Sequence, residues 1–272
     1  MSELQDKKLA VIGLGKLGGI LVKAFLERGL LRPDQVRGTV QHSDRAERRR
    51  REYGIEVGTD NPAAARWADI LLVAVKPKLV KPVLEEMASL LRPEQLLISV
   101  AASVTTSYIE AVVGEIPVVR AMPNTPCAVG AGMTALCGGK FATEAQVALA
   151  RELFDAVGRT VVLDEMHFDA VTGLSASGPA YIYIILESLA EAGVKVGLPR
   201  EISTLLAAQT AMGAAKVVLE TGSHPALLKD AVTTPAGCTI DGIMELEEGK
   251  LRVTLIKAVV KAVQRARELV CG

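Results

Sequence analysis

Hydrophobic and polar residues follow two different patterns in the two parts of the chain. As far as residue 163, short apolar runs alternate with amphipathic stretches, which predicts strands and helices in alternation. One run, 69–75, is almost continuously apolar, as is typical of a parallel strand covered on both faces. We therefore expect an α/β domain over residues 1–163. Its predicted strands are 8–12, 36–40, 69–75, 96–101, 118–121, 132–137 and 160–163.

After residue 164 only helical periodicity occurs, which predicts an all-α domain over residues 164–272. From Tyr181 to Leu189 the apolar residues go nearly all the way round, so we expect this helix to be buried, partly by a second subunit. A small helical domain rich in Ala, Val and Leu has more apolar surface than its own core can use. The expected helices are 167–174, 179–192, 200–220, 225–232, 239–247 and 253–270.

The residues before the second of these helices are small and polar. Ser175, Ser177 and Gly178 are typical N-cap residues, and Pro179 suits a first helical turn, where its missing N–H would have no partner. A helix is thus expected to start near Pro179. Free N–H groups and hydroxyls at such a start can bind a small anion, although the residues by themselves favour an ordinary capped helix.

A glycine-rich segment lies between the first predicted strand and an amphipathic stretch. In such a segment the first glycine permits a tight turn, the second lets the backbone approach a pyrophosphate, and the third lets the helix lie close on the strand. This context predicts a Rossmann-type dinucleotide-binding domain. The residues are Gly13, Leu14, Gly15, Lys16, Leu17 and Gly18.

The end of the second strand bears on which dinucleotide binds. An NAD-specific site places Asp or Glu there to bond the ribose 2′-hydroxyl. Here the strand end is uncharged, and the hydroxyl and cationic groups that follow favour a 2′-phosphate and hence NADP(H). The negative charge of Asp44 weakens this prediction. We interpret the basic run 48–51 as a solvated helix face. The residues after the strand are Gln41, His42, Ser43, Asp44 and Arg45.

Composition narrows the function classes. Half of the 272 residues are apolar and the formal net charge is zero, so the chain has no general attraction for nucleic acid or anionic lipid. The charged N-terminus is unlike a secretory signal, and no uninterrupted apolar run approaches the roughly 20 residues of a membrane helix. The four cysteines and three histidines show no zinc-binding spacing. We expect a cytoplasmic protein with reduced thiols, no metal, and no nucleic-acid or membrane partner.

Several separated motifs, in the right order, resemble those of the pyrroline-5-carboxylate reductase family, which catalyses the last step of proline biosynthesis. They are AVIGLGKLGG, LLVAVKPK, ISVAASVT, VVRAMPNTP, DAVTGLSASGPAYIYIILESLAEAGVKVGLPR and HPALLKDAVTTPAGCTIDGIMELE, and together they cover almost the whole chain. The resemblance implies reduction of the cyclic imine 1-pyrroline-5-carboxylate to L-proline by NADPH, with NADH as a weaker donor.

The resemblance also implies which residues form the site. The glycine segment with His42, Ser43 and Arg45 is expected on the adenosine side of the cofactor. Residues 233–239 have the parts of an anion nest but taken alone favour an ordinary N-capping turn, whereas the resemblance makes them the loop that grips the substrate carboxylate. The residues expected near the nicotinamide are Ala74, Val75, Lys76, Pro77, Ala101, Ala102, Met122, Pro123 and Asn124. Those expected to bind substrate are Thr172, Gly178, Thr234, Ala236, Gly237, Cys238 and Thr239.

Reduction of an imine needs a hydride donor, a protonated C=N and fixed geometry between them. Because the substrate can arrive protonated, no strong general acid is required, and none of the three histidines is expected to be catalytic. Our candidates are Thr239, to hydrogen-bond the ring nitrogen, and Ser175 and Ser177, to shape the pocket.

In the resembled family the helices interleave into a dimer, and five dimers commonly form a ring, so we expect a homodimer and a decamer built from it. Two alternatives stay open. One is another two-domain NADP-dependent dehydrogenase of the 6-phosphogluconate or β-hydroxyacid type, which generally carries a catalytic lysine where this chain has Ser and Tyr. The other is a non-catalytic NADPH-binding protein, in which we would expect the substrate loop to be lost.

Overall fold

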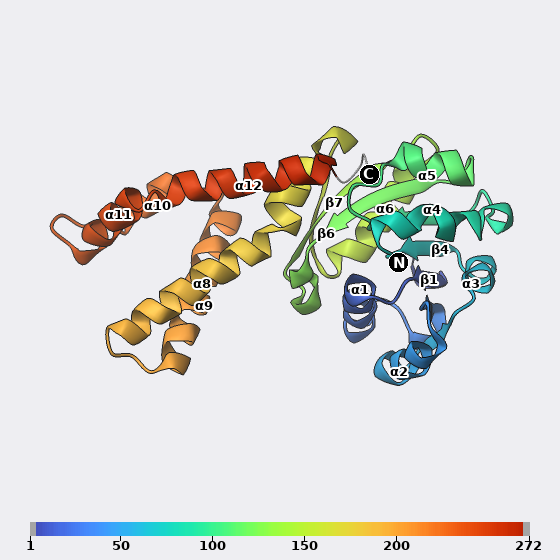
Figure 1. Ribbon diagram of the computed structural model, residues 1–272, viewed down its shortest axis with the longest axis horizontal. Coiled ribbons are helices and arrows are strands. Elements are labelled where there is room, and N and C mark those ends of the chain that lie inside the picture. The colour runs from blue at the N-terminus through green and yellow to red at the C-terminus, as the bar shows by residue number, and fades with distance from the viewer. Residues whose placement is uncertain (1–3, 269–272) are drawn as a thin grey trace. The chain divides into compact units, whose positions relative to one another are not determined.

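The computed structural model describes residues 4–268. Its strands form one eight-stranded sheet, in the order β3-β2-β1-β4-β5-β6-β7-β8, of which Figure 1 labels β1, β4, β6 and β7. All neighbouring strands are parallel except β6 and β7, which confirms the predicted parallel-dominated α/β fold. The strands are β1 (Leu9–Ile12), β2 (Val36–Thr39), β3 (Glu56–Gly58), β4 (Ile70–Val73), β5 (Leu96–Ser99), β6 (Val118–Pro123), β7 (Gly132–Gly138) and β8 (Gly158–Val162).

The prediction missed β3 at the edge of the sheet. This strand is three residues long, and only Val57 in it is buried, so it has no apolar run that a pattern could reveal. The other strands occur where they were expected.

Side chains of β1 alternate between two cores. Leu9 and Val11 lie in one core, and Ala10 and Ile12 lie in the other, as expected for a strand between two helical layers. The first core is completed mainly by α1 (Lys16–Glu27) and α6 (Glu144–Asp155), and the second by α3 (Asn61–Trp67), α4 (Pro77–Glu85) and α5 (Thr106–Val113).

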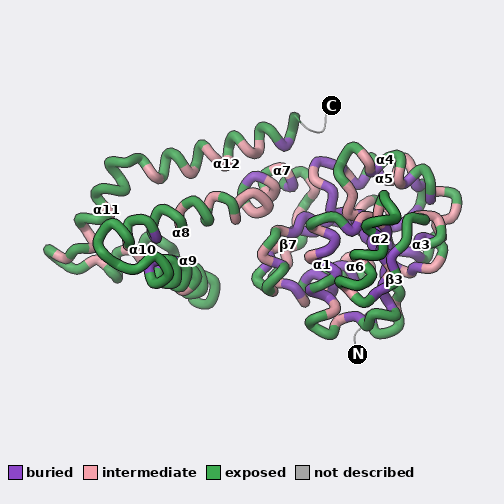
Figure 2. The backbone as a smooth tube through the Cα atoms, turned by 60° about the horizontal axis from the view of Figure 1, so that its bottom comes forward, coloured by how far each residue is buried: buried purple, intermediate pink, exposed green. Residues whose placement is uncertain are grey.

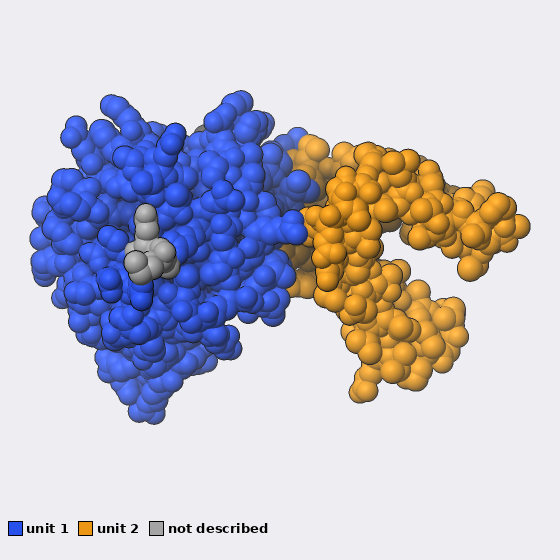
Figure 3. Space-filling view, turned by 180° about the vertical axis from the view of Figure 1, so that it is seen from behind, with its two compact units in different colours: residues 1–177, 262–272 blue, residues 178–261 orange. Residues whose placement is uncertain are grey.

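The chain forms two compact units (Figure 3). One unit comprises residues 1–177 and 262–272, and the other comprises residues 178–261, so the second is an insertion within the chain of the first. The end of α12 (Leu251–Glu268) belongs to the first unit, where the Ser103 hydroxyl donates to the Ala266 carbonyl at 3.0 Å. The expected domain boundary after residue 163, where strands give way to helices, stays a prediction.

The second unit is entirely helical, and its helices bury little within one chain (Figure 2). Only Ala190 of α8 (Gly178–Lys195) is buried, although we expected this helix to have no broad exposed face. Gly193 of α8 lies against Ser203 of α9, where a β-carbon would come within 2.6 Å of the serine hydroxyl. The other helices are α9 (Arg200–Thr221), α10 (Pro225–Ala231), α11 (Cys238–Glu248) and the first part of α12.

By length and composition, α9 qualifies as a membrane span, with a mean hydropathy of 1.4 over its most apolar window. The expectation that no uninterrupted apolar run reaches this length still holds, because Gln209, Thr210 and Lys216 interrupt α9. Only 11% of the window is buried within one chain. The core helix of a multi-subunit protein passes the same test, so the finding by itself indicates an apolar surface in need of cover.

The segment before α8 differs from the expected capping turn. α7 (Phe168–Val171) runs into a π-helical turn (Thr172–Ala176), in which the Ser177 N–H donates to the Thr172 carbonyl at 3.0 Å. The Ser177 hydroxyl donates to the same carbonyl at 2.9 Å. The predicted helix start near Pro179 is confirmed, since α8 begins at Gly178, but the Ser177 N–H is bonded within the preceding turn and is not free.

Candidate active site

Five strands of the first unit end at one edge of the sheet. Ile12 pairs with Thr39 and with Val73, and Val73 pairs with Ser99, so β1, β2, β4 and β5 end level with one another. β6 runs parallel beside β5 and ends at Pro123. The ends of these strands and the segments that follow them carry every residue expected on the cofactor, and this is the edge where parallel sheets bind ligands.

The three glycines of the first loop differ in what surrounds them. Gly13 has a φ of +98°, and a β-carbon there would lie 2.7 Å from Val75 Cγ1. A β-carbon on Gly18 would lie 2.5 Å from the Gly13 carbonyl oxygen, so α1 lies close on the strand. At Gly15 a β-carbon would meet nothing within 4 Å. Gly13 and Gly18 are therefore required by packing, whereas Gly15 leaves open space at the start of α1, which fits a bound pyrophosphate.

Hydrogen bonds to β2 fix this loop. Leu14 N–H donates to the Thr39 carbonyl at 2.8 Å, and Gly13 N–H donates to the Thr39 hydroxyl at 3.3 Å. The Leu14 side chain is buried, and a β-carbon on Gly38 would strike it at 2.2 Å. Leu14 can therefore offer only its backbone to a ligand, and Lys16, at the start of α1, is exposed.

The residues after β2 are at the start of α2 (Ser43–Tyr53), and His42, Ser43 and Arg45 are all exposed there. A helix start carries partial positive charge and free N–H groups, so this position suits a phosphate. Three of the four arginines in the run 48–51 pair with Glu47 or Glu52 of the same helix, which supports our interpretation of that run as a solvated face.

The nicotinamide-side candidates differ in what their side chains can offer. Met122 points into a small core with Phe168, and Ala101 is also buried, whereas Lys76 and Pro77 are exposed at the start of α4. Asn124 uses both ends of its carboxamide within the protein, donating to the Ser175 carbonyl at 3.3 Å and accepting from the Met133 N–H at 2.8 Å.

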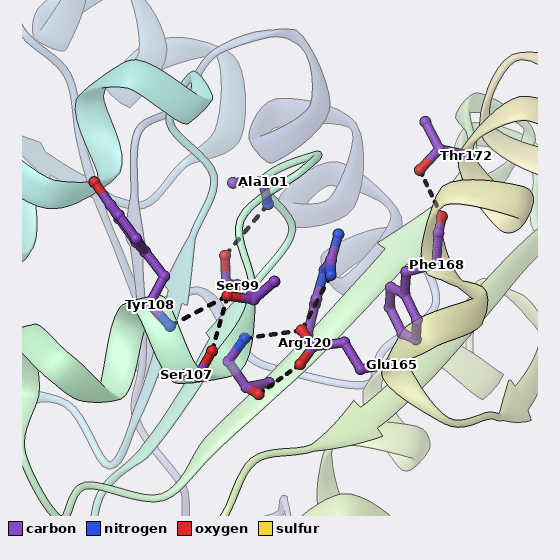
Figure 4. Close-up of polar contacts among 10 residues, drawn as sticks. Ser99, Ala101, Ser107, Tyr108, Arg120, Glu165, Phe168 and Thr172 are labelled. Atoms are coloured by element: carbon purple, nitrogen blue, oxygen red, sulfur yellow. Dashed lines mark hydrogen bonds and ion pairs between the residues drawn. The ribbon is translucent and has the colours of Figure 1, made fainter. Parts of the chain in front are cut away.

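A buried ion pair joins the sheet to the segment that follows β8 (Figure 4). Arg120 of β6 is 2% exposed and donates to Glu165 at 3.0 Å. The same carboxylate accepts from the Thr106 N–H and hydroxyl, both at 2.8 Å, and so caps the start of α5. The Arg120 guanidinium also lies 4.7 Å from the centre of the Phe168 ring.

Sequence reasoning missed this network, although the position of Arg120 in the sequence indicates that such a partner must exist. Arg120 interrupts the apolar strand segment VVRAM, and a charge inside a buried strand requires a partner. Nothing in the sequence marks Glu165 as that partner. The ion pair connects the strand leading to Met122 and Asn124 with the segment leading to Thr172 and Ser175.

The remaining substrate candidates lie in the second unit, apart from Thr172. Gly178 begins α8, and the loop before α11 turns at Ala236, whose φ is +57°. Gly237 N–H donates to the Thr234 carbonyl at 3.0 Å, and Gly237 is the N-cap of α11. A left-handed residue before a helix start presents adjacent N–H groups as an anion nest does. Cys238 is exposed and Thr239 is half-buried in the first turn.

All three histidines are exposed, and the expectation that none is catalytic stays a prediction. His224 accepts a hydrogen bond from the Ala226 N–H at 3.2 Å, which caps α10.

Known proteins resemble the chain along its full length. A protein of Glycine max named pyrroline-5-carboxylate reductase is 43% identical over 262 residues, which is 96% of this chain and 95% of that protein. The chain belongs to the pyrroline-5-carboxylate reductase family. The family model for pyrroline-5-carboxylate reductase dimerisation matches residues 165–269, and that for NADP oxidoreductase, coenzyme F420-dependent, matches residues 8–103.

Solved structures of pyrroline-5-carboxylate reductases have the same fold throughout. The protein from Coxiella burnetii is 38% identical with a TM-score of 0.88, and the match covers 97% of this chain and 98% of that one. The protein from Plasmodium falciparum, solved with NADP bound, is 29% identical with a TM-score of 0.90 over 98% and 99%. A prephenate dehydrogenase from A. aeolicus, at 11% identity and a TM-score of 0.57, shares the fold alone.

Proposed function

We propose that this protein is a pyrroline-5-carboxylate reductase that transfers a hydride from NADPH to the C=N bond of 1-pyrroline-5-carboxylate and forms L-proline. The observation that carries the proposal is the full-length similarity to proteins of that name at 43% identity. The reaction consumes one hydride and one proton for each imine reduced. Neither a β-hydroxyacid dehydrogenase activity nor a purely NADPH-binding role has a specific observation in its favour.

The geometry of the first unit suits the dinucleotide. When bound, the cofactor supplies the hydride. The open space at Gly15 and the start of α1 would hold its pyrophosphate, and the start of α2 with Ser43 and Arg45 would hold the 2′-phosphate of NADPH. NADH lacks that phosphate, which is why we expect it to serve as the weaker donor.

The hydroxyl groups near the π-helical turn are oriented by the backbone. Thr172 Oγ1 donates to the Phe168 carbonyl at 2.8 Å, and the Ser177 hydroxyl donates to the Thr172 carbonyl. With their protons directed there, both hydroxyls can accept a hydrogen bond from the substrate but are poorly placed to donate one. Thr239 stays our candidate for the hydrogen bond to the ring nitrogen because the family resemblance places the matching threonine there, while Ser175 and Ser177 shape the pocket.

The substrate carboxylate fits the loop before α11. The Cys238 N–H follows the left-handed Ala236 in the first turn of α11, and Thr234 adds a hydroxyl, whereas the Gly237 N–H is already bonded to the Thr234 carbonyl. An anion at this position would also gain from the positive end of α11, which is eleven residues long.

We further propose a homodimer formed through the helical unit, with five dimers in a ring, in the cytoplasm. The dimerisation family model covers this part of the chain. Ile184, Leu205 and Ile256 are between 62% and 64% exposed within one chain, and burial of such side chains is what drives association. Light scattering tests the assembly, and the mass of a single chain for the active protein would contradict the proposed dimer.

The decisive experiment for the activity follows NADPH absorbance with 1-pyrroline-5-carboxylate, beside NADH and beside a β-hydroxyacid with NADP⁺. We expect turnover of the imine and faster turnover with NADPH. Thr239→Val is matched by Thr254→Val, since Thr254 lies on α12 with its hydroxyl bonded to the Lys250 carbonyl. Full kcat/KM in Thr239→Val would remove Thr239 from the mechanism. If the protein oxidises the β-hydroxyacid and does not reduce the imine, the proposed reaction is wrong.

A further inference from the structure

One side chain connects the end of β6 with the π-helical turn. The Asn124 carboxamide is held at its oxygen by the Met133 N–H of β7, at 2.8 Å, and its nitrogen reaches the Ser175 carbonyl at 3.3 Å. Both bonds lie within the first compact unit. Asn124 directly follows the strand whose end is expected beside the nicotinamide, and Ser175 belongs to the turn that carries the substrate-pocket candidates.

The Ser175 carbonyl lacks its usual helical donor. In a continuous α-helix it would bond the N–H four residues later, but that residue is Pro179, which has none. The carboxamide of Asn124 therefore supplies a donor where the helix cannot. Single π-helical turns within helices occur frequently at functional sites, and this one directly precedes the proline-modified turn.

We propose that Asn124 is a positioning residue that fixes the π-helical turn relative to the end of β6. The inference rests on the proposed function, and it gives Asn124 a different role from the cofactor contact expected from the sequence. A displacement of reacting groups by about 1 Å can lower a rate by about a hundredfold. The link therefore acts on kcat for imine reduction, whereas a direct contact would act on NADPH affinity.

Two substitutions separate these roles. Asn124→Asp removes the donor to Ser175 while keeping an acceptor for Met133, and Pro179→Ala provides the helical N–H that Ser175 lacks. We expect Asn124→Asp to lower kcat about tenfold, the effect of one neutral hydrogen bond, and to change the NADPH Kd by less than about twofold. The double variant should regain most of the lost kcat.

Two further variants control for charge and for the loss of an asparagine. Asn124→Ala loses both hydrogen bonds and introduces no charge. It should lower kcat at least as much as Asn124→Asp, which would show that the loss does not come from the carboxylate charge. Asn61→Ala removes a carboxamide bonded to Glu86 at 2.9 Å on the exposed side of α3, and should leave kcat and the NADPH Kd unchanged.

Amide hydrogen exchange gives a readout independent of turnover. In Asn124→Asp the Ser177 amide, which closes the π-helical turn, should lose protection, while the Met133 amide keeps it. Unchanged protection of Ser177 would overturn the proposal, as would a tenfold rise in NADPH Kd with unaltered kcat, or no recovery with Pro179→Ala. If the wild-type protein fails to reduce the imine, the proposed function is wrong, and the Ser177 exchange result still decides whether the link exists.

Discussion

Glu165→Gln tests how far the buried Arg120 depends on its single carboxylate. The two side chains are 3% and 27% exposed, and among residues 4–268 the Nε and Nη2 atoms of Arg120 have no hydrogen-bond partner. The substitution leaves a positive charge inside the protein with the Phe168 ring as its remaining counter-group. Removing one partner of a buried pair costs about 3–5 kcal/mol. Because Glu165 is partly exposed and an amide oxygen can still accept from Arg120, we expect about 3 kcal/mol.

The free energy of unfolding in urea, measured at one fixed protein concentration because the helical unit is expected to associate, provides the assay. The matched control is Glu56→Gln, whose partner Arg37 lies 2.8 Å away in a pair 34% and 62% exposed, and which should cost less than about 1 kcal/mol. Adding Arg120→Met to Glu165→Gln should recover stability, since it removes the unpaired charge. If Glu165→Gln costs no more than Glu56→Gln, the reasoning about this ion pair is refuted.

Three other outcomes follow from single positions. Gly13→Ala should abolish NADPH binding in a fluorescence titration, because of the φ of +98° and the approach of Val75; normal affinity would exclude the proposed role of the loop. Ala236→Gly should raise the free energy of unfolding by about 1 kcal/mol, because the left-handed backbone there suits glycine; a loss would mean that the loop conformation is different. Burial, with the Glu165 charge adding to it, raises the pKa of Cys137 to about 12, so this thiol stays protonated below that pH, whereas Cys238 is exposed. The reaction of the wild-type protein with a thiolate-selective reagent at pH 8 should therefore show a fast phase that is absent in Cys238→Ser. An unchanged fast phase would contradict the assignment of Cys238 as the reactive thiol.

The parts of the fold that repeat a simple pattern could be predicted from sequence. Continuous apolar runs gave seven of the strands, and the glycine segment gave the first loop, because each depends on residues adjacent in the chain. The edge strand β3 could not be found, since a single buried residue, Val57, carries it.

The segment before α8 shows why local signals are ambiguous. Ser177 and Pro179 suit the beginning of a helix, and α8 does begin at Gly178, but the turn before it is π-helical: the Thr172 carbonyl accepts two bonds from Ser177, and Asn124 reaches the Ser175 carbonyl. The deciding groups are 51 residues apart in sequence. The same holds for Arg120 and Glu165, 45 residues apart, of which only the arginine is conspicuous in the sequence.

The insertion of the helical unit has a consequence for synthesis on the ribosome. Residues 262–268 complete the sheet-containing unit, and the Ala266 carbonyl is the acceptor for the buried Ser103 hydroxyl. That hydroxyl is made 163 residues before its partner, so the first unit cannot finish folding until the helical unit between them has been synthesised. Until then, the loop beside Ala101 and Ala102 lacks the support of α12.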